Sequence, residues 1–221
     1  MERIPEPELM LDEEQARVYA GADFEEPHEN FIEEFRLAFP DVVSCGFVLD
    51  LGCGPGDISA RFARAFPECE VHGIDGSRAM LKFGRMIVGG DRGLEKRIRL
   101  CYGLLPDFDP PRDHYDIVIS NSLLHHLADP MSLWDTARRL ALPGAPVFVM
   151  DLMRPASADD AVRLVKAHAG GEPELLQHDF YHSLLAAYRL DEVREQLRAA
   201  RLDHFVVQAA SDRHLVAYGR V

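Results

Sequence analysis

The stretch 48-VLDLGCGPGDIS-59 decides the fold that we expect for this chain. An apolar run, typical of a buried strand, is followed at once by glycines at positions 52, 54 and 56 and then by a helix-compatible segment. A glycine-rich turn between a parallel strand and a helix lets backbone amides approach a ligand closely. The stretch therefore predicts a binding site at the carboxyl end of this strand.

Short apolar runs alternate with helix-compatible segments from about residue 42 to residue 153. Strands and helices that alternate at this spacing form a parallel sheet covered by helices on both faces. The fold class that we expect is therefore α/β, with a Rossmann-like, mostly parallel sheet. The predicted strands are 47–51, 70–75, 97–102, 115–120 and 145–152, and the predicted helices are 58–66, 77–88 and 130–142.

The N-terminal segment departs from this alternation. Residues 12–20 and 28–39 both predict helices, and the second has apolar side chains at helical spacing, which are Phe31, Ile32, Phe35 and Phe39. We expect residues 1–41 to form an N-terminal helical cap, with residues 42–221 as the main domain.

The C-terminal part also departs from the alternation of strands and helices. We expect residues 155–190 to be an insertion that acts as a substrate lid. Residues 189–202 predict an amphipathic helix, and residues 204–220 predict a closing hairpin.

The amino-acid composition limits the kinds of partner that we expect for the protein. The 221 residues carry a formal net charge of -13, and 13 of the acids stand against 3 basic residues in residues 1–41. A nucleic-acid surface needs a concentrated basic stripe, which the sequence lacks, so we expect no nucleic acid as a partner. No apolar run reaches membrane-spanning length and the first residues do not look like a signal peptide, so we expect no membrane partner and a cytoplasmic location. Whether the protein is a monomer or a homodimer stays open.

The four cysteines form no C-x-x-C pair. They lie in or beside predicted buried strands, so we interpret them as reduced packing residues and expect no metal site from them.

Two ligand classes compete for the glycine-rich turn. A dinucleotide site has the pattern G-x-G-x-x-G, but here Asp57 stands in place of the third glycine and Asp50 ends the strand. A carboxylate beside a pyrophosphate repels it, whereas a ligand with an ammonium group benefits from Asp50. S-adenosylmethionine is a ligand of the second class.

The segment VLDLGCGPG resembles the first motif of the class I S-adenosylmethionine-dependent methyltransferases, and the resemblance continues in order over about residues 42–153. It implies a seven-stranded, mostly parallel sheet with an antiparallel last strand, and S-adenosylmethionine as cofactor. The segment VHGIDGS places Asp75 at the next strand end, where a carboxylate accepts both ribose hydroxyls. The cofactor-binding residues that we expect are Asp50, Gly52, Cys53, Gly54, Gly56, Asp75, Gly76, Ser77, Met80, Gly103, Leu104, Asn121 and Ser122.

The segment 119-ISNSLLHHLADP-130 resembles a loop of small-molecule methyltransferases in which one histidine acts as a base. The nearest match is His126, with His125 as the second choice. The resemblance also implies Tyr19 as a catalytic neighbour of His126, because a tyrosine pairs with that histidine in some members. The alternative is that the imidazoles cap a helix or bond a carbonyl, and that Tyr19 only packs.

Side chains of the predicted lid could enclose an organic acceptor. The substrate-binding residues that we expect are Arg154, Tyr181, His182 and Tyr188. Simple packing of an amphipathic helix on the sheet explains the same spacing equally well. The function that we expect is methyl transfer to a small molecule; the alternatives are an RNA or protein methyltransferase and a cofactor-binding protein with altered or no transfer chemistry.

Overall fold

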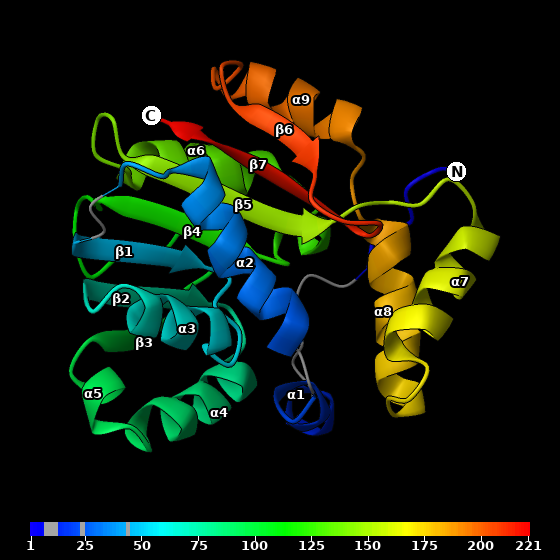
Figure 1. The fold of residues 1–221 in the computed structure, drawn as a ribbon, viewed down its shortest axis with the longest axis horizontal. Helices are drawn as coiled ribbons and strands as arrows, with labels where there is room; N and C mark the ends of the chain where they lie inside the picture. The colour runs from blue at the N-terminus through cyan, green and yellow to red at the C-terminus, as the bar shows by residue number, and fades with distance from the viewer. Residues whose placement is uncertain (7–12, 23–24, 43–44) are drawn as a thin grey trace.

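The computed structural model describes residues 1–6, 13–22, 25–42 and 45–221, and Figure 1 shows their arrangement. The strands are β1 Cys45–Leu51, β2 Glu68–Asp75, β3 Ile98–Tyr102, β4 Ile117–Asn121, β5 Pro146–Leu152, β6 Val206–Ala209 and β7 His214–Arg220. The helices are α1 Glu13–Ala20, α2 Glu25–Ala38, α3 Asp57–Ala65, α4 Arg78–Gly89, α5 Arg92–Glu95, α6 Met131–Leu140, α7 Ala158–Ala169, α8 Glu174–Ala186 and α9 Leu190–Ala199, with a 3-10 turn, η1, at Leu124–His126.

The strands form one seven-stranded sheet in the order β3-β2-β1-β4-β5-β7-β6. Strands β1 to β5 pair in parallel, while β7 runs antiparallel to both of its neighbours, β5 and β6. The predicted Rossmann-like sheet with an antiparallel last strand is therefore confirmed. The connections reverse direction between β1 and β4, and a sheet of this kind binds ligands in the crevice beyond the carboxyl ends of the strands at that reversal.

Alternate residues of the central strands face opposite layers of helices. In β5, Val147 and Val149 lie in a hydrophobic cluster with α6 and α9, whereas Phe148 and Met150 lie in a second cluster with α2 and α3. This two-residue period is the geometry of a strand that is buried on both faces. The expected helical cover on both sides of the sheet is therefore present, as Figure 1 shows.

Helix α2 belongs to one of these covering layers. The ring of Phe31 meets Phe148 of β5 edge to face at a centroid distance of 5.0 Å, and Phe35 meets Phe62 of α3 in the same way at 5.0 Å. Both α2 rings are fully buried, because their helical spacing points them at the sheet. The boundary that the sequence placed at residue 41 therefore does not separate two hydrophobic cores.

Three helices lie beyond the carboxyl ends of the strands. Helices α7 and α8 pack on each other through a third, smaller cluster, and they lie side by side next to the sheet in Figure 1. Helix α1 lies between α4 and α8, because Glu13 pairs with Lys82 of α4 at 3.2 Å and Gln15 donates to Asp179 of α8 at 2.8 Å. These helices make the walls around the end of the sheet. In the described part of the chain, no helix has the length and apolarity that a membrane span requires.

The buried ring of Phe35 provides a test of the α2 packing. Phe35→Ala removes a fully buried aromatic side chain and leaves a cavity, so we expect a loss of about 3–5 kcal/mol in the free energy of unfolding, measured by urea denaturation. Leu37→Ala on the same helix is the matched control, because Leu37 is 75% exposed and its loss should change stability by no more than about 0.5 kcal/mol. A small effect at both positions would show that α2 is not part of the core.

Candidate active site

A cavity of about 1300 Å³ opens at the carboxyl edge of the sheet. Its lining comes from the ends of β1, β2 and β4, from α1 and α2, and from α8. Pockets for drug-sized ligands measure about 300–1,000 Å³, so this cavity has room for a nucleoside-sized ligand and a second molecule. It lies at the sheet edge that the glycine-rich turn predicts.

The glycines of the turn adopt left-handed backbone angles that other residues rarely tolerate. The φ angles of Gly52, Gly54 and Gly56 are 72°, 52° and 76°. A Cβ atom at Gly54 would meet nothing within 4 Å, whereas one at Gly52 would lie 2.8 Å from the side chain of Leu123. The turn therefore needs glycine for its conformation, and it leaves open space above Gly54.

Asp75 ties the turn to the next strand. Its Oδ2 accepts a hydrogen bond from the amide of Gly54 at 2.8 Å, and its Oδ1 accepts one from the amide of Ser77 at 2.7 Å. Burial raises the pKa of Asp75, although both amides act to lower it. Each carboxylate oxygen has two lone pairs, so both can accept a further hydrogen bond from a ligand.

Asp50 lies under the turn at the end of β1. Its carboxyl is 1% exposed and accepts a hydrogen bond of 2.5 Å from the hydroxyl of Ser59. Burial raises its pKa to about 7, with the hydroxyl of Ser59 acting against this and the nearby Asp75 adding to it. A carboxyl in this position loses its proton readily when a cation binds beside it.

Met80, Gly103 and Leu104 lie together on the side of the cavity next to β2 and β3. Met80 is buried in the first turn of α4, and its amide donates a hydrogen bond to the hydroxyl of Ser77, the N-cap residue of that helix. A Cβ atom at Gly103 would lie 2.7 Å from the side chain of Phe108, so a side chain has no room there. The surface is apolar and suits a flat aromatic ring.

The end of β4 supplies a polar rim. Asn121 and Ser122 line the cavity, and Ser122 has a φ angle of 54°. A non-glycine residue with such an angle is strained by about 1–3 kcal/mol and is frequent at functional sites. The amide of Ser122 donates to the carbonyl of Met150 at 2.9 Å, which holds this conformation.

The structure thus brings nearly all of the predicted cofactor-binding residues to one cavity. The residues that line it are Asp50, Gly52, Cys53, Gly54, Asp75, Gly76, Ser77, Met80, Gly103, Leu104, Asn121 and Ser122. Gly56 lies outside the lining and occupies the N-cap position of α3. Burial also raises the pKa of the Cys53 thiol well above its usual value, so this thiol stays protonated.

The two histidines of the loop after β4 line the same cavity, next to α8. His125 is 2% exposed, and its Nδ1 lies 2.5 Å from Oδ1 of the buried Asp151. Burial lowers the pKa of His125, but Asp151 and Glu6 together raise it by more, so the net shift of the pKa is upward. His126 is less buried, and its Nδ1 lies 3.2 Å from Oε1 of Glu6.

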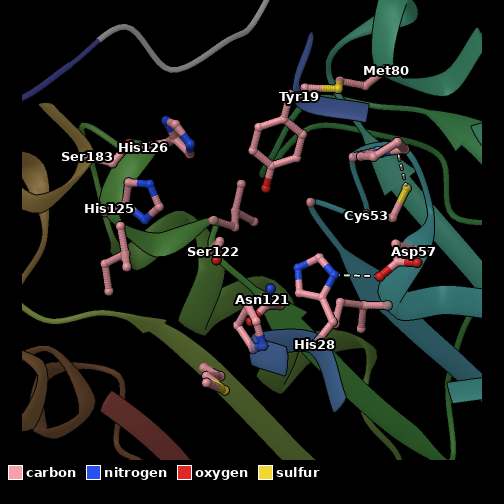
Figure 2. Close-up of a pocket in the computed structure, with 18 of the residues that line it drawn as sticks. Tyr19, His28, Cys53, Asp57, Met80, Asn121, Ser122, His125, His126 and Ser183 are labelled. Atoms are coloured by element: carbon pink, nitrogen blue, oxygen red, sulfur yellow. Dashed lines mark hydrogen bonds and ion pairs between the residues drawn. The ribbon is translucent and has the colours of Figure 1, made fainter. Parts of the chain in front are cut away.

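Tyr19 extends from α1 toward the middle of the cavity (Figure 2). In this view its hydroxyl lies between the histidine loop on one side and His28 with Asp57 on the other. Burial raises the pKa of Tyr19 to about 12, and the charges of Asp57, Asp75 and Asp151 act in the same direction. Tyr19 therefore keeps its proton at neutral pH and can donate a hydrogen bond to a ligand.

Sequence reasoning missed a group on the opposite wall. His28 of α2 lies with its Nδ1 2.5 Å from Oδ2 of Asp57, and the Nε of Arg61 lies 2.8 Å from the same oxygen. Burial alone would raise the pKa of Asp57, but the hydrogen bonds from His28 and Arg61 bring it below its usual value. The signal for Asp57 was its place in the glycine turn; nothing local in the sequence marked His28.

Two expected substrate-binding residues have structural partners instead. Arg154 is 5% exposed and donates from Nη2 to Glu192 at 2.5 Å and from Nη1 to the carbonyl of Ala187 at 3.0 Å. The hydroxyl of Tyr188 donates to the carbonyl of Leu127 at 3.3 Å, and the guanidinium of Arg3 lies 4.1 Å from its ring centroid. Neither residue lines the cavity, because both join α8 and the segment after it to neighbouring elements.

The other two expected substrate-binding residues, Tyr181 and His182, also lie outside the cavity lining. Tyr181 packs on the cluster between α7 and α8, and the ring of His182 lies 4.3 Å from that of His178. The face of α8 that lines the cavity follows the helical period and carries Leu176, Asp179, Phe180 and Ser183. Helix α8 therefore lines the cavity with side chains other than the expected Tyr181 and His182, and the role of residues 155–190 as a substrate lid stays a prediction.

The buried carboxyl of Asp50 makes stability depend on pH. Its pKa of about 7 in the folded protein lies above its ordinary value of 3.8, so between these values the folded state binds more protons and this group lowers stability as pH rises. Asp50→Asn removes the charge, and we expect it to raise the free energy of unfolding at pH 8 by on the order of 2–4 kcal/mol, and by much less at pH 4.

Urea denaturation at the two pH values measures this difference. Asp109→Asn, at an exposed loop position, is the control and should behave like the parent protein. An equal effect of Asp50→Asn at both pH values would contradict the raised pKa.

The comparison with a family of methyltransferase domains agrees with this geometry. Residues 49–147 match the family model described as "Methyltransferase domain", which covers the glycine-rich turn, the Asp75 strand and the histidine loop. The chain is 28% identical over 181 residues to an uncharacterized methyltransferase of Mycobacterium bovis, covering 79% of this chain and 83% of that protein.

Two further proteins are similar in part or in fold. The chain is 34% identical over 110 residues to the ubiquinone biosynthesis O-methyltransferase of Bordetella pertussis, which is 48% of this chain and only 43% of that relative. The solved structure of the plantazolicin methyltransferase BpumL, bound to a pentazolic desmethylplantazolicin analogue and SAH, superposes with a TM-score of 0.71 at 14% identity, covering 94% of this chain and 89% of that one. Residues 49–147 thus match a methyltransferase domain, and together with the methyltransferase relatives and the shared fold they support a class I S-adenosylmethionine-dependent methyltransferase with S-adenosylmethionine as cofactor.

Proposed function

We propose that this protein transfers a methyl group from S-adenosylmethionine to a small organic acceptor held between the sheet edge, α1 and α8. The observation that carries this proposal is the continuity of one cavity, which extends from the glycine-rich turn, past the hydroxyl of Tyr19, to the histidine loop and α8. Its volume of about 1300 Å³ leaves room for an acceptor beside a bound nucleoside.

The lining fits the cofactor part by part. Both oxygens of Asp75 have capacity for the ribose hydroxyls, and the open space above Gly54 admits the ligand close to the main chain. Asp50 is placed for the ammonium group, directly or through a water. We assign the carboxylate end of the cofactor to the neighbourhood of His28 and Arg61, the two side chains that meet at Asp57.

The bound cofactor supplies an electrophilic methyl group, whose transfer neutralises the positive charge on sulfur. The chain supplies alignment of the acceptor and exclusion of water, which account for most of the acceleration in such a displacement. Tyr19 keeps its proton, so it orients the acceptor as a hydrogen-bond donor. The loop of His125 and His126 lies beside the space for the acceptor, and it activates the acceptor for methyl transfer.

The lining also favours one class of acceptor. Seven of the lining side chains are acidic against two arginines, and the acidic residues are Glu29, Glu33, Asp50, Asp57, Asp75, Glu172 and Asp179. An acidic wall favours a neutral or cationic small molecule and disfavours a polyanion such as RNA. A small-molecule acceptor agrees with two of the similar proteins, the ubiquinone biosynthesis O-methyltransferase and the plantazolicin methyltransferase. A cytoplasmic location stays a prediction, as does the expectation that the protein is a monomer or a homodimer.

Binding of the demethylated cofactor tests the cofactor half of the site. Asp75→Asn keeps the size of the side chain but removes its charge and one acceptor, so we expect the affinity for S-adenosylhomocysteine to fall roughly 10- to 100-fold by isothermal titration calorimetry. Asp107→Asn, in an exposed loop, is the matched control and should bind as the parent protein does. Equal affinity in the two variants would remove Asp75 from the site.

Turnover with labelled cofactor and a panel of phenols, thiols and amines tests the reacting half. Once an acceptor is found, His126→Ala is expected to lower its methylation by about 10²- to 10⁴-fold while the affinity for S-adenosylhomocysteine stays the same. Tyr19→Phe should raise KM more than it lowers kcat, because the hydroxyl orients the acceptor. Full activity in His126→Ala would exclude this loop from the reaction.

A further inference from the structure

A carboxylate and two imidazoles meet beside the acceptor space. Oε1 of Glu6 lies 3.2 Å from Nδ1 of His126 and 3.5 Å from Nε2 of His125. The three atoms all lie within 4.8 Å of one another. Among the residues that the structure describes, it is the one group of three potential metal-binding side chains whose ligand atoms lie this close together.

The distances from Glu6 to the two histidines are those between neighbouring ligands of one tetrahedral ion. Zinc binds nitrogen and oxygen at about 2.0–2.2 Å, so two ligand atoms of a tetrahedral site lie about 3.4 Å apart. Two histidines and one glutamate also form one of the donor sets of catalytic zinc sites, in which the fourth position stays open for water or substrate. The pairs of Glu6 with each histidine match this distance to within about 0.2 Å.

Further side chains hold two of the three ligands in orientation. Asp151 accepts from Nδ1 of His125 at 2.5 Å, which leaves Nε2 directed at Glu6, and the amide of Leu124 fixes the other carboxylate oxygen at 2.6 Å. The hydroxyl of Ser183 donates to Oε1 of Glu6 at 3.0 Å. A carboxylate behind a ligating histidine is the usual support of a metal site.

The N-terminal segment that carries Glu6 is anchored on both sides. Arg3 donates to the carbonyls of His125 at 2.8 Å and Ala186 at 2.5 Å, and the amide of Ile4 donates to the carbonyl of Leu185 at 3.0 Å. These contacts tie the segment to the histidine loop and to α8. Glu6 is therefore brought to the histidines by bonds that do not involve its own carboxylate.

We propose that Glu6, His125 and His126 bind one zinc ion, whose open coordination position faces the acceptor space. His125 and His126 both line the cavity, so a fourth ligand can reach the ion from there. The chemical class that fits this position is a hydroxyl, phenol or thiol group of the acceptor. The proposed role in turnover rests on the proposed function, whereas zinc binding itself does not.

The zinc site gives the histidine loop a different task from the general base that the sequence predicted for His126. A bound zinc ion would lower the pKa of an acceptor hydroxyl, phenol or thiol, which would release its proton to water without a basic imidazole, and the methyl group would then pass from the sulfonium to the deprotonated acceptor. The spacing of the four cysteines in the sequence predicted no metal site. Glu6 lies more than a hundred positions before the histidines, so no local spacing could indicate the set.

Another place on the surface could bind zinc by chance. His178 and His182 lie one helical turn apart on α8, with ring centroids 4.3 Å apart, and His178 is exposed. The single variant His178→Ala breaks this pair and is the background in which the test is made, because His182 lies within electrostatic range of Glu6 and is kept. Glu2→Gln, at an exposed position of the same N-terminal segment, is the matched control for Glu6→Gln.

Isothermal titration of zinc chloride into the metal-free background variant measures the site. We expect about one zinc ion per chain, at least a 10-fold lower affinity in Glu6→Gln and His126→Ala, and an unchanged affinity in Glu2→Gln. Asp151→Asn should lower the zinc affinity by about 10- to 100-fold, because it acts through His125. Circular dichroism confirms that each variant is folded.

Loss of zinc binding in the background variant would assign the ion to the surface pair and overturn the proposal. Equal zinc affinity in Glu6→Gln, His126→Ala and Glu2→Gln would overturn it as well. S-adenosylhomocysteine is titrated separately into the same metal-free protein. Binding of S-adenosylhomocysteine without zinc binding removes the metal site and leaves the proposed function standing, whereas zinc binding without S-adenosylhomocysteine binding removes the proposed function and leaves the metal site.

Discussion

The carboxylate of Asp75 is the contact on which the ligand half of this structure depends. It accepts hydrogen bonds from the amides of Gly54 and Ser77, so one side chain holds the glycine-rich turn after β1 and the turn after β2 in a fixed relation. Parallel strands bring their carboxyl ends to the same edge, but they do not by themselves fix the loops that follow. The bond from Asp75 does so, and it leaves the outer lone pairs of both oxygens available to a ligand.

The walls of the cavity depend on a different kind of contact. Arg3 bonds carbonyl groups of the histidine loop and of α8 and stacks on Tyr188, while Gln15 and Glu13 fasten α1 to α8 and α4. The acidic N-terminal segment thus contributes specific contacts in addition to its charge. It delivers Tyr19 and His28 to the cavity and Glu6 to the histidines that line it, from three separate positions of the chain.

Much of the sheet could be predicted because its signals are local. The apolar runs, the glycine turn and the Asp75 strand each occupy fewer than about ten consecutive residues, and a strand buried on both faces needs nothing more distant to be recognised. The side chains of α8 that line the cavity were harder to predict. Leu176, Asp179, Phe180 and Ser183 share one helical face, but the sequence does not say which face of that helix turns toward the cavity. Arg154 looked like an acceptor contact, yet its partner Glu192 lies 38 positions further along the chain.

The sequence by itself determined the α/β order, the glycine-rich turn, the strand-end carboxylates of Asp50 and Asp75, and the histidine loop, because each depends on residues that are neighbours in the chain. Only the tertiary structure decided which side chains face the acceptor. The pairing of His28 with Asp57, of His125 with Asp151, and of Glu6 with the histidines joins positions separated by 29, 26 and more than a hundred residues. Such pairs form because folding closes the chain around a common cavity, and the packing of helices on the sheet, rather than local sequence, sets their distances.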